Sequence, residues 1–473
     1  MNPKIAHVIG LGKSGLAAAR LLKIQGWTVT LQDRSDTNPL QEQKKQLAME
    51  GIGVNLGKPY DPNQQDLAPQ DLTQEDLNQE KYIPTLIVVS PGVPWDLPGL
   101  KRSRELGIEV IGEMALAWRN LQDVPWVGIT GTNGKTTTTA LVAAIFQTAG
   151  LSAPACGNIG YAGCELALNY CQGKVSKLDW VIAELSSYQI ESSPEIAPKI
   201  GIWTTFTPDH LARHYTLDNY FQIKSQLLKQ SAWGIFNGDD PELKQRIPSL
   251  FPQAQWTSTQ GIESLPSQTV PGVYLKGGWI YAENQKILRA DTLKMVGSHN
   301  AQNLLMATAT ALRAGIDPQL IDRAVQDFPG VPHRLEIVRT YQQVRFINDS
   351  KATNYDAAAV GLAAVEAPVI LIAGGESKEG DDRVWIQEIK AKVVTVLLIG
   401  NAAPLFDKNL RSMGYSSVEI VETLALAIQR SVELIPVLNP NVILLSPACA
   451  SFDQYENFEQ RGDHFRSLCQ ALS

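Results

Sequence analysis

The sequence predicts an α/β protein with three domains, and three observations lead to this prediction. Its 473 residues correspond to about three domains at roughly 150 residues each. Short β-branched runs alternate with Ala- and Leu-rich stretches, which is typical of parallel sheets flanked by helices. Hydrophobic residues make up 44% and charged residues 19%, which excludes a disordered, collagen-like or coiled-coil chain.

Nine runs are typical of buried strands, and most of them end in Gly, Ser, Thr, Glu or Asp before a loop. They are Ile5–Ile9, Thr28–Gln32, Leu86–Ser90, Trp126–Thr130, Trp180–Glu184, Ile200–Thr204, Val369–Ala373, Val393–Ile399 and Val442–Ser446. In open α/β sheets, ligands bind at the carboxyl ends of the strands. The motifs described below fall at those ends.

Two breaks divide the chain into the predicted domains 1–112, 113–330 and 331–473. The first break lies near Gly112, before a helix that leads to the strand at Trp126. The second lies at Gly330–Pro332, within a Phe-Pro-Gly-Val-Pro run. Residues 61–81 are rich in Gln, Asp, Glu and Asn, and we expect them to form a solvated surface insertion or a polar helix.

The first glycine-rich loop, Gly10–Gly15, fits the pattern G-x-G-x-x-G between a predicted strand and a helix over Leu16–Ile24. Asp33 ends the next strand, as in dinucleotide-binding domains. The loop therefore predicts a Rossmann-like N-terminal domain that binds a diphosphate at a helix N-terminus. On this motif alone NAD(P) is the leading ligand, a UDP-type ligand comes second, and a ligand-free turn is the third interpretation.

A second loop predicts a central domain with a parallel sheet of the P-loop ATPase type. It follows the strand Val127–Thr130, opens a helix over Thr138–Gln147, and consists of Gly131, Thr132, Asn133, Gly134, Lys135, Thr136 and Thr137. In such loops, backbone N–H groups surround phosphates, the lysine reaches the β- and γ-phosphates, and the hydroxyl binds Mg²⁺. Ile129 stands where the strict P-loop pattern has its first glycine.

Further magnesium ligands are expected near this loop. Glu184 ends an apolar strand, which is the layout of a second P-loop metal ligand. His210 follows another strand end, in the run Thr-Pro-Asp-His. Lys224 lies on a predicted helix, Asn219–Leu228, and on its own would be interpreted as a surface lysine.

Taken together, these motifs resemble the Mur ligases, the ATP-dependent amide-forming enzymes of peptidoglycan precursor synthesis. The resemblance runs in order along nearly the whole chain. It rests on the P-loop, the Glu184 strand followed by Leu-Ser-Ser-Tyr-Gln, Asp209–His210, the helix with Lys224, residues 298–303 (Ser-His-Asn-Ala-Gln-Asn) and His333–Arg334. The resemblance implies a C-terminal Rossmann-like α/β domain that binds the amino acid.

Within the family, the C-terminal segments are most similar to those of members that add D-glutamate to UDP-N-acetylmuramoyl-L-alanine. These segments are residues 348–354 (Asn-Asp-Ser-Lys-Ala-Thr-Asn), 445–454 (Leu-Ser-Pro-Ala-Cys-Ala-Ser-Phe-Asp-Gln) and 458–462 (Phe-Glu-Gln-Arg-Gly). The Asp-Asn-Pro-Arg signature of the diaminopimelate- or lysine-adding relatives does not occur. The first loop would then bind the uridine diphosphate end of this substrate, and the reaction would pass through an acyl phosphate.

The resemblance also implies roles for individual residues. The UDP-substrate would be bound by Lys13, Ser14, Asp33, Arg34, Gly157 and Asn158. ATP would be bound by the P-loop residues with Asn303, Arg334 and Asp349. D-glutamate would be bound by Lys351, Thr353, Lys378, Ser451 and Phe458. Two Mg²⁺ ions would be held by Thr136, Glu184, His210 and a carbamylated Lys224. Catalysis would depend on Lys135, His210, Lys224 and Lys351.

Charge and cysteine content set limits on the remaining possibilities. The net charge is −7, so nucleic acid held by phosphate neutralisation is not an expected partner. The five cysteines fit neither a disulfide framework nor a paired zinc site. No apolar stretch is long enough for a membrane span or a signal peptide, and we expect a monomeric cytoplasmic protein.

Three alternative functions stay open. The first is another Mur-type or folylpolyglutamate-type amino-acid ligase, with a different amine. The second is an NAD(P) oxidoreductase that uses the first glycine-rich loop, which leaves the P-loop, Glu184 and His210 unexplained. The third is a P-loop ATPase or switch that turns over or holds ATP without a nucleotide-sugar.

Overall fold

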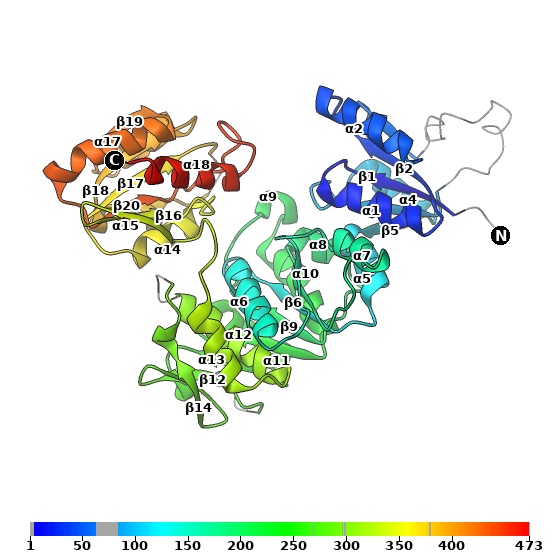
Figure 1. Ribbon diagram of the computed structural model, residues 1–473, viewed down its shortest axis with the longest axis horizontal. Coiled ribbons are helices and arrows are strands. Elements are labelled where there is room, and N and C mark those ends of the chain that lie inside the picture. The colour runs from blue at the N-terminus through cyan, green and yellow to red at the C-terminus, as the bar shows by residue number, and fades with distance from the viewer. Residues whose placement is uncertain are drawn as a thin grey trace. The chain divides into compact units, whose positions relative to one another are not determined.

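A computed structural model describes residues 4–62, 84–267, 269–295, 297, 299–377 and 380–472. The chain forms two compact units, one made of Met1–Ala290 with Asn303–Val325 and the other of Asp291–Gln302 with Gln326–Ser473. Helices flank three separate sheets (Figure 1), so the predicted α/β class with three domains is confirmed. Most of the predicted polar insertion at 61–81 lies outside the described residues, and so does Lys378.

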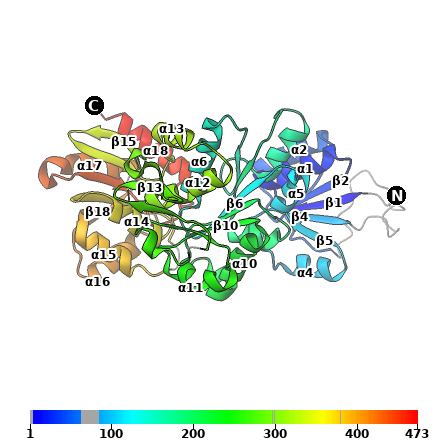
Figure 2. The same cartoon turned by 90° about the horizontal axis from the view of Figure 1, so that it is seen from below.

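The first sheet has five parallel strands in the order β3-β2-β1-β4-β5. Figure 2 shows β1, β2, β4 and β5 side by side. The strands are β1 (Ile5–Ile9), β2 (Thr28–Asp33), β3 (Gly53–Leu56), β4 (Leu86–Val89) and β5 (Glu109–Gly112). The helices are α1 (Lys13–Ile24), α2 (Asn38–Met49) and α4 (Pro98–Glu105). The strand order reverses between β1 and β4, so the loops after these two strands border a crevice that suits a ligand.

The second sheet has nine strands in the order β14-β13-β12-β11-β10-β9-β6-β8-β7, parallel from β7 to β12 and antiparallel at β13 and β14. The strands are β6 (Trp126–Thr130), β7 (Ala155–Gly157), β8 (Val181–Glu184), β9 (Ile200–Trp203), β10 (Trp233–Asn237), β11 (Gln255–Ser258), β12 (Val273–Lys276), β13 (Trp279–Ala282) and β14 (Gln285–Arg289). β6 lies between β8 and β9, so the segments that follow these three strands share one edge.

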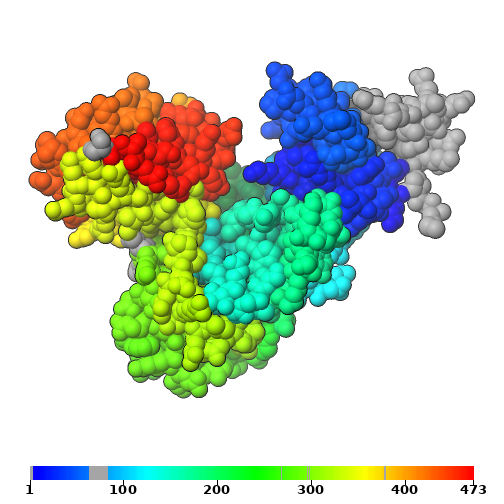
Figure 3. Space-filling view, viewed as in Figure 1, coloured from blue at the N-terminus to red at the C-terminus, as the bar shows by residue number. Residues whose placement is uncertain are grey.

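Helices flank this sheet, and α6 and α7 lie at the surface in the space-filling view (Figure 3, cyan to green). They are α5 (Glu113–Leu121), α6 (Lys135–Thr148), α7 (Gly163–Cys171), α8 (Ser187–Ser192), α9 (Leu211–His214), α10 (Leu217–Gln230), α11 (Pro241–Leu250), α12 (His299–Arg313), α13 (Pro318–Asp327), and the 3₁₀ turns η3 (Ile262–Ser264) and η4 (Ala290–Thr292). Among the described residues, no helix has the length and hydropathy that crossing a bilayer would require.

The third sheet has six strands in the order β15-β16-β20-β17-β18-β19, with β15 antiparallel at the edge. The strands are β15 (Glu336–Tyr341), β16 (Val344–Asn348), β17 (Val369–Gly374), β18 (Val393–Ile399), β19 (Val418–Glu422) and β20 (Val442–Leu445). The helices are α14 (Tyr355–Ala364), α15 (Arg383–Lys392), α16 (Ala403–Ser412), α17 (Leu424–Leu438) and α18 (Phe458–Gln470).

All nine predicted strands are present, with ends that differ by one residue at most. The helices begin earlier than predicted: α1 begins at Lys13 rather than Leu16, and α6 begins at Lys135 rather than Thr138. In both cases the last residues of the glycine-rich loop already form the first helical turn. The backbone N–H groups of a first helical turn have no partner within the helix, and these are the groups that bind anions.

Candidate active site

The glycine-rich loop after β1 owes its shape to its first and third glycines. Gly10 has a φ of +98°, which favours glycine. A Cβ atom built at Gly15 would lie 1.9 Å from the carbonyl oxygen of Gly10, so α1 can approach the loop only without a side chain there. A Cβ at Gly12 would meet nothing within 4 Å. The middle glycine therefore leaves the backbone open to a ligand.

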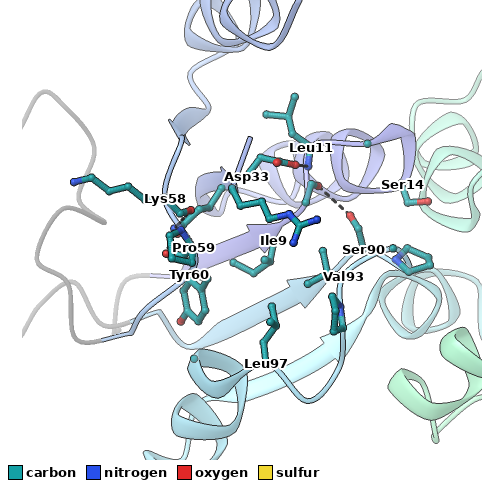
Figure 4. Close-up of a pocket in the computed structure, with 18 of the residues that line it drawn as sticks. Ile9, Leu11, Ser14, Asp33, Lys58, Pro59, Tyr60, Ser90, Val93 and Leu97 are labelled. Atoms are coloured by element: carbon teal, nitrogen blue, oxygen red, sulfur yellow. Dashed lines mark hydrogen bonds between the residues drawn. The ribbon is translucent and has the colours of Figure 1, made fainter. Parts of the chain in front are cut away.

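The Asp33 carboxylate fixes this loop. Its Oδ2 accepts a hydrogen bond from the backbone N–H of Leu11 at 2.8 Å, and its Oδ1 accepts one from the N–H of Ser35 at 2.9 Å. The Ser90 hydroxyl adds a bond to the carbonyl oxygen of Gly10 at 3.0 Å. Figure 4 shows Asp33 and Ser90 on opposite sides of the loop. Asp33 thus orients the loop and borders the cavity beside it.

That cavity has a volume of about 1000 Å³, and all six residues predicted for the UDP-substrate line it. They are Lys13, Ser14, Asp33, Arg34, Gly157 and Asn158. The cavity extends from the crevice between β1 and β4 to the loop after β7 in the second sheet. Its cationic side chains suit a diphosphate.

Sequence reasoning missed a second group of lining residues. It comprises Lys58, Tyr60, Ser90, Val93, Leu97, Arg102 and Gln189; Figure 4 labels most of them. Several of these residues follow β3 and β4. The rule that ligands bind at the carboxyl ends of strands could have identified them. The rule could not be applied after β3, because the sequence did not predict that four-residue strand.

The second glycine-rich loop is held closely by its own side chains and by the segment that follows β9. The Lys135 amine donates to the carbonyl oxygens of Gly131 and Thr132 at 2.9 and 2.8 Å. The backbone N–H of Asn133 donates to the Thr205 hydroxyl at 2.8 Å. Gly134, with a φ of +83°, turns the chain into α6. The lysine is therefore fixed at the helix N-terminus, where a phosphate would bind.

Two of the other residues predicted for ATP or metal, Thr136 and Asn303, lie at or beside this loop. Thr136 is buried in the first turn of α6. The Asn303 side-chain oxygen accepts a hydrogen bond from the Thr138 hydroxyl at 3.2 Å. A Cβ at Gly134 would approach the same oxygen to 2.7 Å. Asn303 thus closes one side of the loop.

Glu184 is a buried carboxylate with one oxygen available for a ligand. It ends β8, next to β6, and is only 1% exposed. Its Oε1 accepts a hydrogen bond from the Asn158 side-chain amide at 2.8 Å. Its Oε2 is buried and has no hydrogen-bond partner. A buried, unpaired carboxylate oxygen is costly unless a cation or proton binds it, so this residue fits a Mg²⁺ ligand.

Lys224 is buried rather than exposed, which is the opposite of its interpretation as an isolated surface lysine. It is 1% exposed on α10, and its amine donates to the Gly131 carbonyl oxygen at 2.9 Å and the Thr130 hydroxyl at 3.3 Å. Burial, reinforced by the positive charge of Lys135, lowers its pKa well below the ordinary value. A neutral amine is the form that can attack the carbon of CO₂.

His210 lies at the end of a strained one-turn helix. It precedes α9 and has a φ of +55°, in the left-handed region. Its Nδ1 lies 3.1 Å from the Tyr188 hydroxyl, and its Nε2 lies 3.4 Å from Asp209 Oδ2. His214 stacks between Tyr188 and Tyr220, with ring centroids 5.3 Å from each. This aromatic stack supports the turn that carries His210.

The carboxyl group of Asp349 lies at the end of β16 in the third sheet. It is buried and accepts a hydrogen bond from the Ser446 hydroxyl at 2.8 Å. A Cβ at Gly361 would lie 2.3 Å from it. Burial raises the pKa of Asp349 to about 7, partly offset by Ser446 and the positive charge of Arg334. The two residues predicted for the nucleotide in this domain are therefore electrostatically coupled.

The described residues predicted for D-glutamate lie on three segments of the third domain, and the structure brings Lys351 and Phe458 together. The Lys351 amine lies 5.2 Å from the centre of the Phe458 ring. The backbone N–H of Thr353 donates to the Lys351 carbonyl oxygen at 2.9 Å. Ser451 is buried, and its carbonyl oxygen accepts from the N–H of Tyr455 at 2.8 Å. Lys378, the fifth predicted residue, lies outside the described part of the chain.

A buried arginine that sequence reasoning missed ties these segments together. The Arg461 guanidinium donates to the hydroxyl and carbonyl oxygens of Ser350, at 3.0 and 2.9 Å, and to the carbonyl oxygen of Cys449 at 3.1 Å. Its burial lowers its pKa to about 10. The signal was its position in the run Phe-Glu-Gln-Arg-Gly, but only the fold shows that it faces inward.

Comparisons with known proteins cover nearly the whole chain. Three family models match in order: the Mur ligase MurD-like N-terminal domain over residues 4–112, the Mur ligase middle domain over 129–311, and the Mur ligase glutamate ligase domain over 333–449. The UDP-N-acetylmuramoylalanine–D-glutamate ligase of Microcystis aeruginosa is 61% identical, with 98% of both chains covered. The enzyme of that name from Rippkaea orientalis is 58% identical, with 99% of both chains covered.

Solved structures show the same fold at low identity. The UDP-N-acetylmuramate–alanine ligase MurC of Thermotoga maritima has a TM-score of 0.59 at 19% identity, covering 98% of this chain and 99% of its own. A pseudomurein peptide ligase type C from Methanothermus fervidus has a TM-score of 0.58 at 17% identity, covering 99% of this chain and 100% of its own. With full-length relatives at such high identity, the chain belongs to the Mur ligase family.

Proposed function

We propose that this chain is an ATP-dependent ligase that joins D-glutamate to UDP-N-acetylmuramoyl-L-alanine, giving ADP and phosphate, in peptidoglycan precursor synthesis. Its relatives at 56–61% identity carry the corresponding name. The structural observation that carries the proposal is the position of Asn158. This residue lines the large cavity and donates a hydrogen bond to Glu184 beside the P-loop. Asn158 therefore links the cavity to Glu184, which ends the strand next to the one that leads into the phosphate-binding loop.

The first domain, 1–112, would hold the uridine diphosphate end of the substrate. The N-terminus of α1 and the cationic side chains of Lys13 and Arg34 face the cavity that a diphosphate would enter. Ser14 would add a hydroxyl donor. Gly157 and Asn158 of the central domain, 113–330, would contact the muramoyl part and direct the L-alanyl carboxylate toward the P-loop.

Activation of that carboxylate is the first chemical step. One carboxylate oxygen attacks the γ-phosphorus of ATP, the bond to the β–γ bridging oxygen breaks, and an acyl phosphate and ADP result. Such transfers depend on positioning and charge neutralisation, which Lys135 supplies at the N-terminus of α6. For Arg334 and Asp349 of the third domain, contact with the nucleotide stays a prediction.

Thr136, Glu184, His210 and Lys224 would hold magnesium, in two sites. Mg²⁺ bound there would neutralise phosphate charge. The unpaired Oε2 of Glu184 supports this assignment. For Lys224, the neutral amine would add CO₂ and lose a proton, which converts a cation into a carbamate anion with two oxygens. The lowered pKa of Lys224 favours that addition.

The third domain, 331–473, would bind D-glutamate. Lys351 and Lys378 suit a dicarboxylate, and Thr353, Ser451 and Phe458 would complete the pocket. The D-glutamate amine attacks the acyl carbon, the nitrogen loses a proton, and the tetrahedral intermediate expels phosphate to leave the amide. We also propose that the enzyme is a monomer in the cytoplasm.

Phosphate release from the purified protein with ATP, Mg²⁺ and UDP-N-acetylmuramoyl-L-alanine tests this proposal. We expect release only when D-glutamate is added, together with a product heavier by one glutamyl unit. Release with a different amino acid would keep the ligase and overturn the D-glutamate pocket. ATP turnover that is indifferent to the nucleotide-sugar would favour the ATPase alternative.

A further inference from the structure

The loop that follows β4, residues 90–97, borders the large cavity and also reaches the second sheet. Ser90, Val93 and Leu97 line the cavity (Figure 4). Residues 90–94 also line a smaller cavity of about 250 Å³, together with Tyr188, Glu191 and Arg213 of α8 and α9. This loop is therefore the element of the first sheet that faces both the nucleotide-sugar cavity and the turn that carries His210.

Asp96 connects this loop to α9. Its Oδ2 accepts a hydrogen bond from the Tyr215 hydroxyl at 2.9 Å, and its Oδ1 lies 3.8 Å from the Arg213 guanidinium. Arg213 also pairs with Glu191 of α8 at 2.9 Å. Arg213 of α9 and Tyr215, which follows α9, therefore contact one carboxylate of the loop after β4.

The α9 turn is short and strained at both ends. Its four residues lie between His210, with a φ of +55°, and Tyr215, with a φ of +66°. Non-glycine residues keep such conformations only where surrounding contacts impose them. At one end, Tyr188 contacts His210, while at the other Asp96 holds Tyr215. Movement of the 90–97 loop would therefore be transmitted to the His210 end.

We propose that Asp96, Arg213 and Tyr215 are positioning residues that couple an occupied nucleotide-sugar cavity to the metal-binding geometry of His210. This inference rests on the proposed function, because it takes the cavity as the nucleotide-sugar site and His210 as a metal ligand. The coupling makes metal binding tighter when the first substrate is bound. By linkage, the first substrate also binds more tightly when metal is present.

The test is the affinity for Mn²⁺, a spectroscopic substitute for Mg²⁺, measured by electron paramagnetic resonance with a non-hydrolysable ATP analogue. It is measured with and without UDP-N-acetylmuramoyl-L-alanine. We expect the nucleotide-sugar to tighten Mn²⁺ binding at least fivefold in the wild type. Asp96→Ala and Tyr215→Phe should each bring this ratio close to one, and the double variant should be no worse than Asp96→Ala.

Glu195→Gln is the matched control, because it breaks another ion pair near α8, with Arg119 at 2.7 Å, that touches neither cavity nor α9. A wild-type ratio of one, an unchanged ratio in Asp96→Ala and Tyr215→Phe, or an equal loss in Glu195→Gln would each overturn the proposal. The Mn²⁺ measurement needs no turnover. Failure of the D-glutamate assay alone would therefore count against the proposed function and not against this coupling.

Discussion

The two glycine-rich loops have the same local layout but different surroundings. Both join a buried parallel strand to the N-terminus of a helix. The first opens on a cavity of about 1000 Å³, and a Cβ at Gly12 would meet nothing within 4 Å. The second folds on itself, with the Lys135 amine bound to two carbonyl oxygens of its own loop. A Cβ at Gly134 would meet Asn303 at 2.7 Å.

The difference indicates that the loop provides an anion site, whereas its neighbours decide the chemistry. Beside the first loop, both carboxylate oxygens of Asp33 accept hydrogen bonds from backbone N–H groups, so Asp33 shapes the binding site. Beside the second loop lie Lys224, a buried amine with a lowered pKa, and Glu184, a buried carboxylate with an unpaired oxygen. Such ionisable groups are costly to bury and typical of catalytic sites. The first loop is therefore suited to recognition and the second to reaction.

The largest effect should come from Lys135→Ala. Removing one preorganised cation from a phosphoryl-transfer site costs on the order of 100- to 1000-fold in kcat. The dissociation constant of UDP-N-acetylmuramoyl-L-alanine, measured by calorimetry, should not change, because Lys135 does not line its cavity. Lys229→Ala, which alters an exposed lysine of α10, is the control. A kcat for Lys135→Ala within tenfold of the wild-type value would contradict the view that the first loop serves recognition and the second loop serves the reaction.

Lys224→Met should separate activity from stability. We expect kcat to fall roughly 100-fold with the loss of a group near the phosphates. The melting temperature should be unchanged or higher, because an apolar side chain replaces a buried ionisable one. In CO₂-free buffer there is a pH range between the lowered pKa of Lys224 in the folded protein and its ordinary pKa in the unfolded chain. In this range the Lys224 amine is protonated in the unfolded chain and neutral in the folded wild type, so the unfolded chain binds one more proton. The free energy of unfolding of the wild type should therefore increase with pH in this range. The Met variant has no amine at this position, so its free energy of unfolding should not show this increase.

More of the fold than of the site could be predicted from the sequence. The nine apolar strands were identifiable, whereas β3 (Gly-Val-Asn-Leu) and β7 (Ala-Cys-Gly) contain too few large apolar residues to show a pattern. The six UDP-substrate residues came from motif positions, and the fold brings them around one cavity. The burial of Lys224 and Arg461 could not be predicted, because helical spacing does not show which charged side chains face inward. Contacts such as Asp96 with Tyr215 depend on packing between sheets.

Glu113, at the start of α5, tests the connection between the two loop-bearing sheets. It is fully buried, and its Oε1 accepts a hydrogen bond from the Cys164 N–H at 2.6 Å. Burial raises its pKa from 4.5 to about 7. The stability that this raised pKa contributes is fully present below pH 4.5 and is lost as the pH rises through about 7.

Glu113→Gln should therefore gain relative to wild type as the pH rises from about 4.5 to 7, by about 3 kcal/mol in the free energy of unfolding. The amide oxygen can keep the bond to Cys164. Urea denaturation at pH 5 and pH 8, followed by tryptophan fluorescence, measures this difference. Glu109→Gln, on an exposed carboxylate of β5, is the control. A constant difference between the two pH values would show that Glu113 stays ionised in the folded protein.

The smallest effects separate two glycines of the same loop. A Cβ at Gly15 would lie 1.9 Å from the Gly10 carbonyl oxygen and 2.8 Å from the Ser90 hydroxyl, so Gly15→Ala must shift backbone. We expect it to cost about 1–3 kcal/mol of stability, like other overpacked sites. Gly12 has a φ of −89° and open space around its Cα, so Gly12→Ala should change stability by less than about 0.5 kcal/mol.

For binding, the order of the two variants should be reversed. Gly12→Ala should weaken nucleotide-sugar binding more than Gly15→Ala does, once the difference in stability is allowed for. The methyl group of Gly12→Ala would project beside the cavity, where a diphosphate must approach the backbone closely, and should weaken nucleotide-sugar binding roughly tenfold, a loss of about 1.4 kcal/mol. Calorimetry with UDP-N-acetylmuramoyl-L-alanine, beside thermal unfolding of the same samples, measures both quantities. If Gly12→Ala instead bound this substrate as the wild type does, the open face of the first loop would not be where the diphosphate lies.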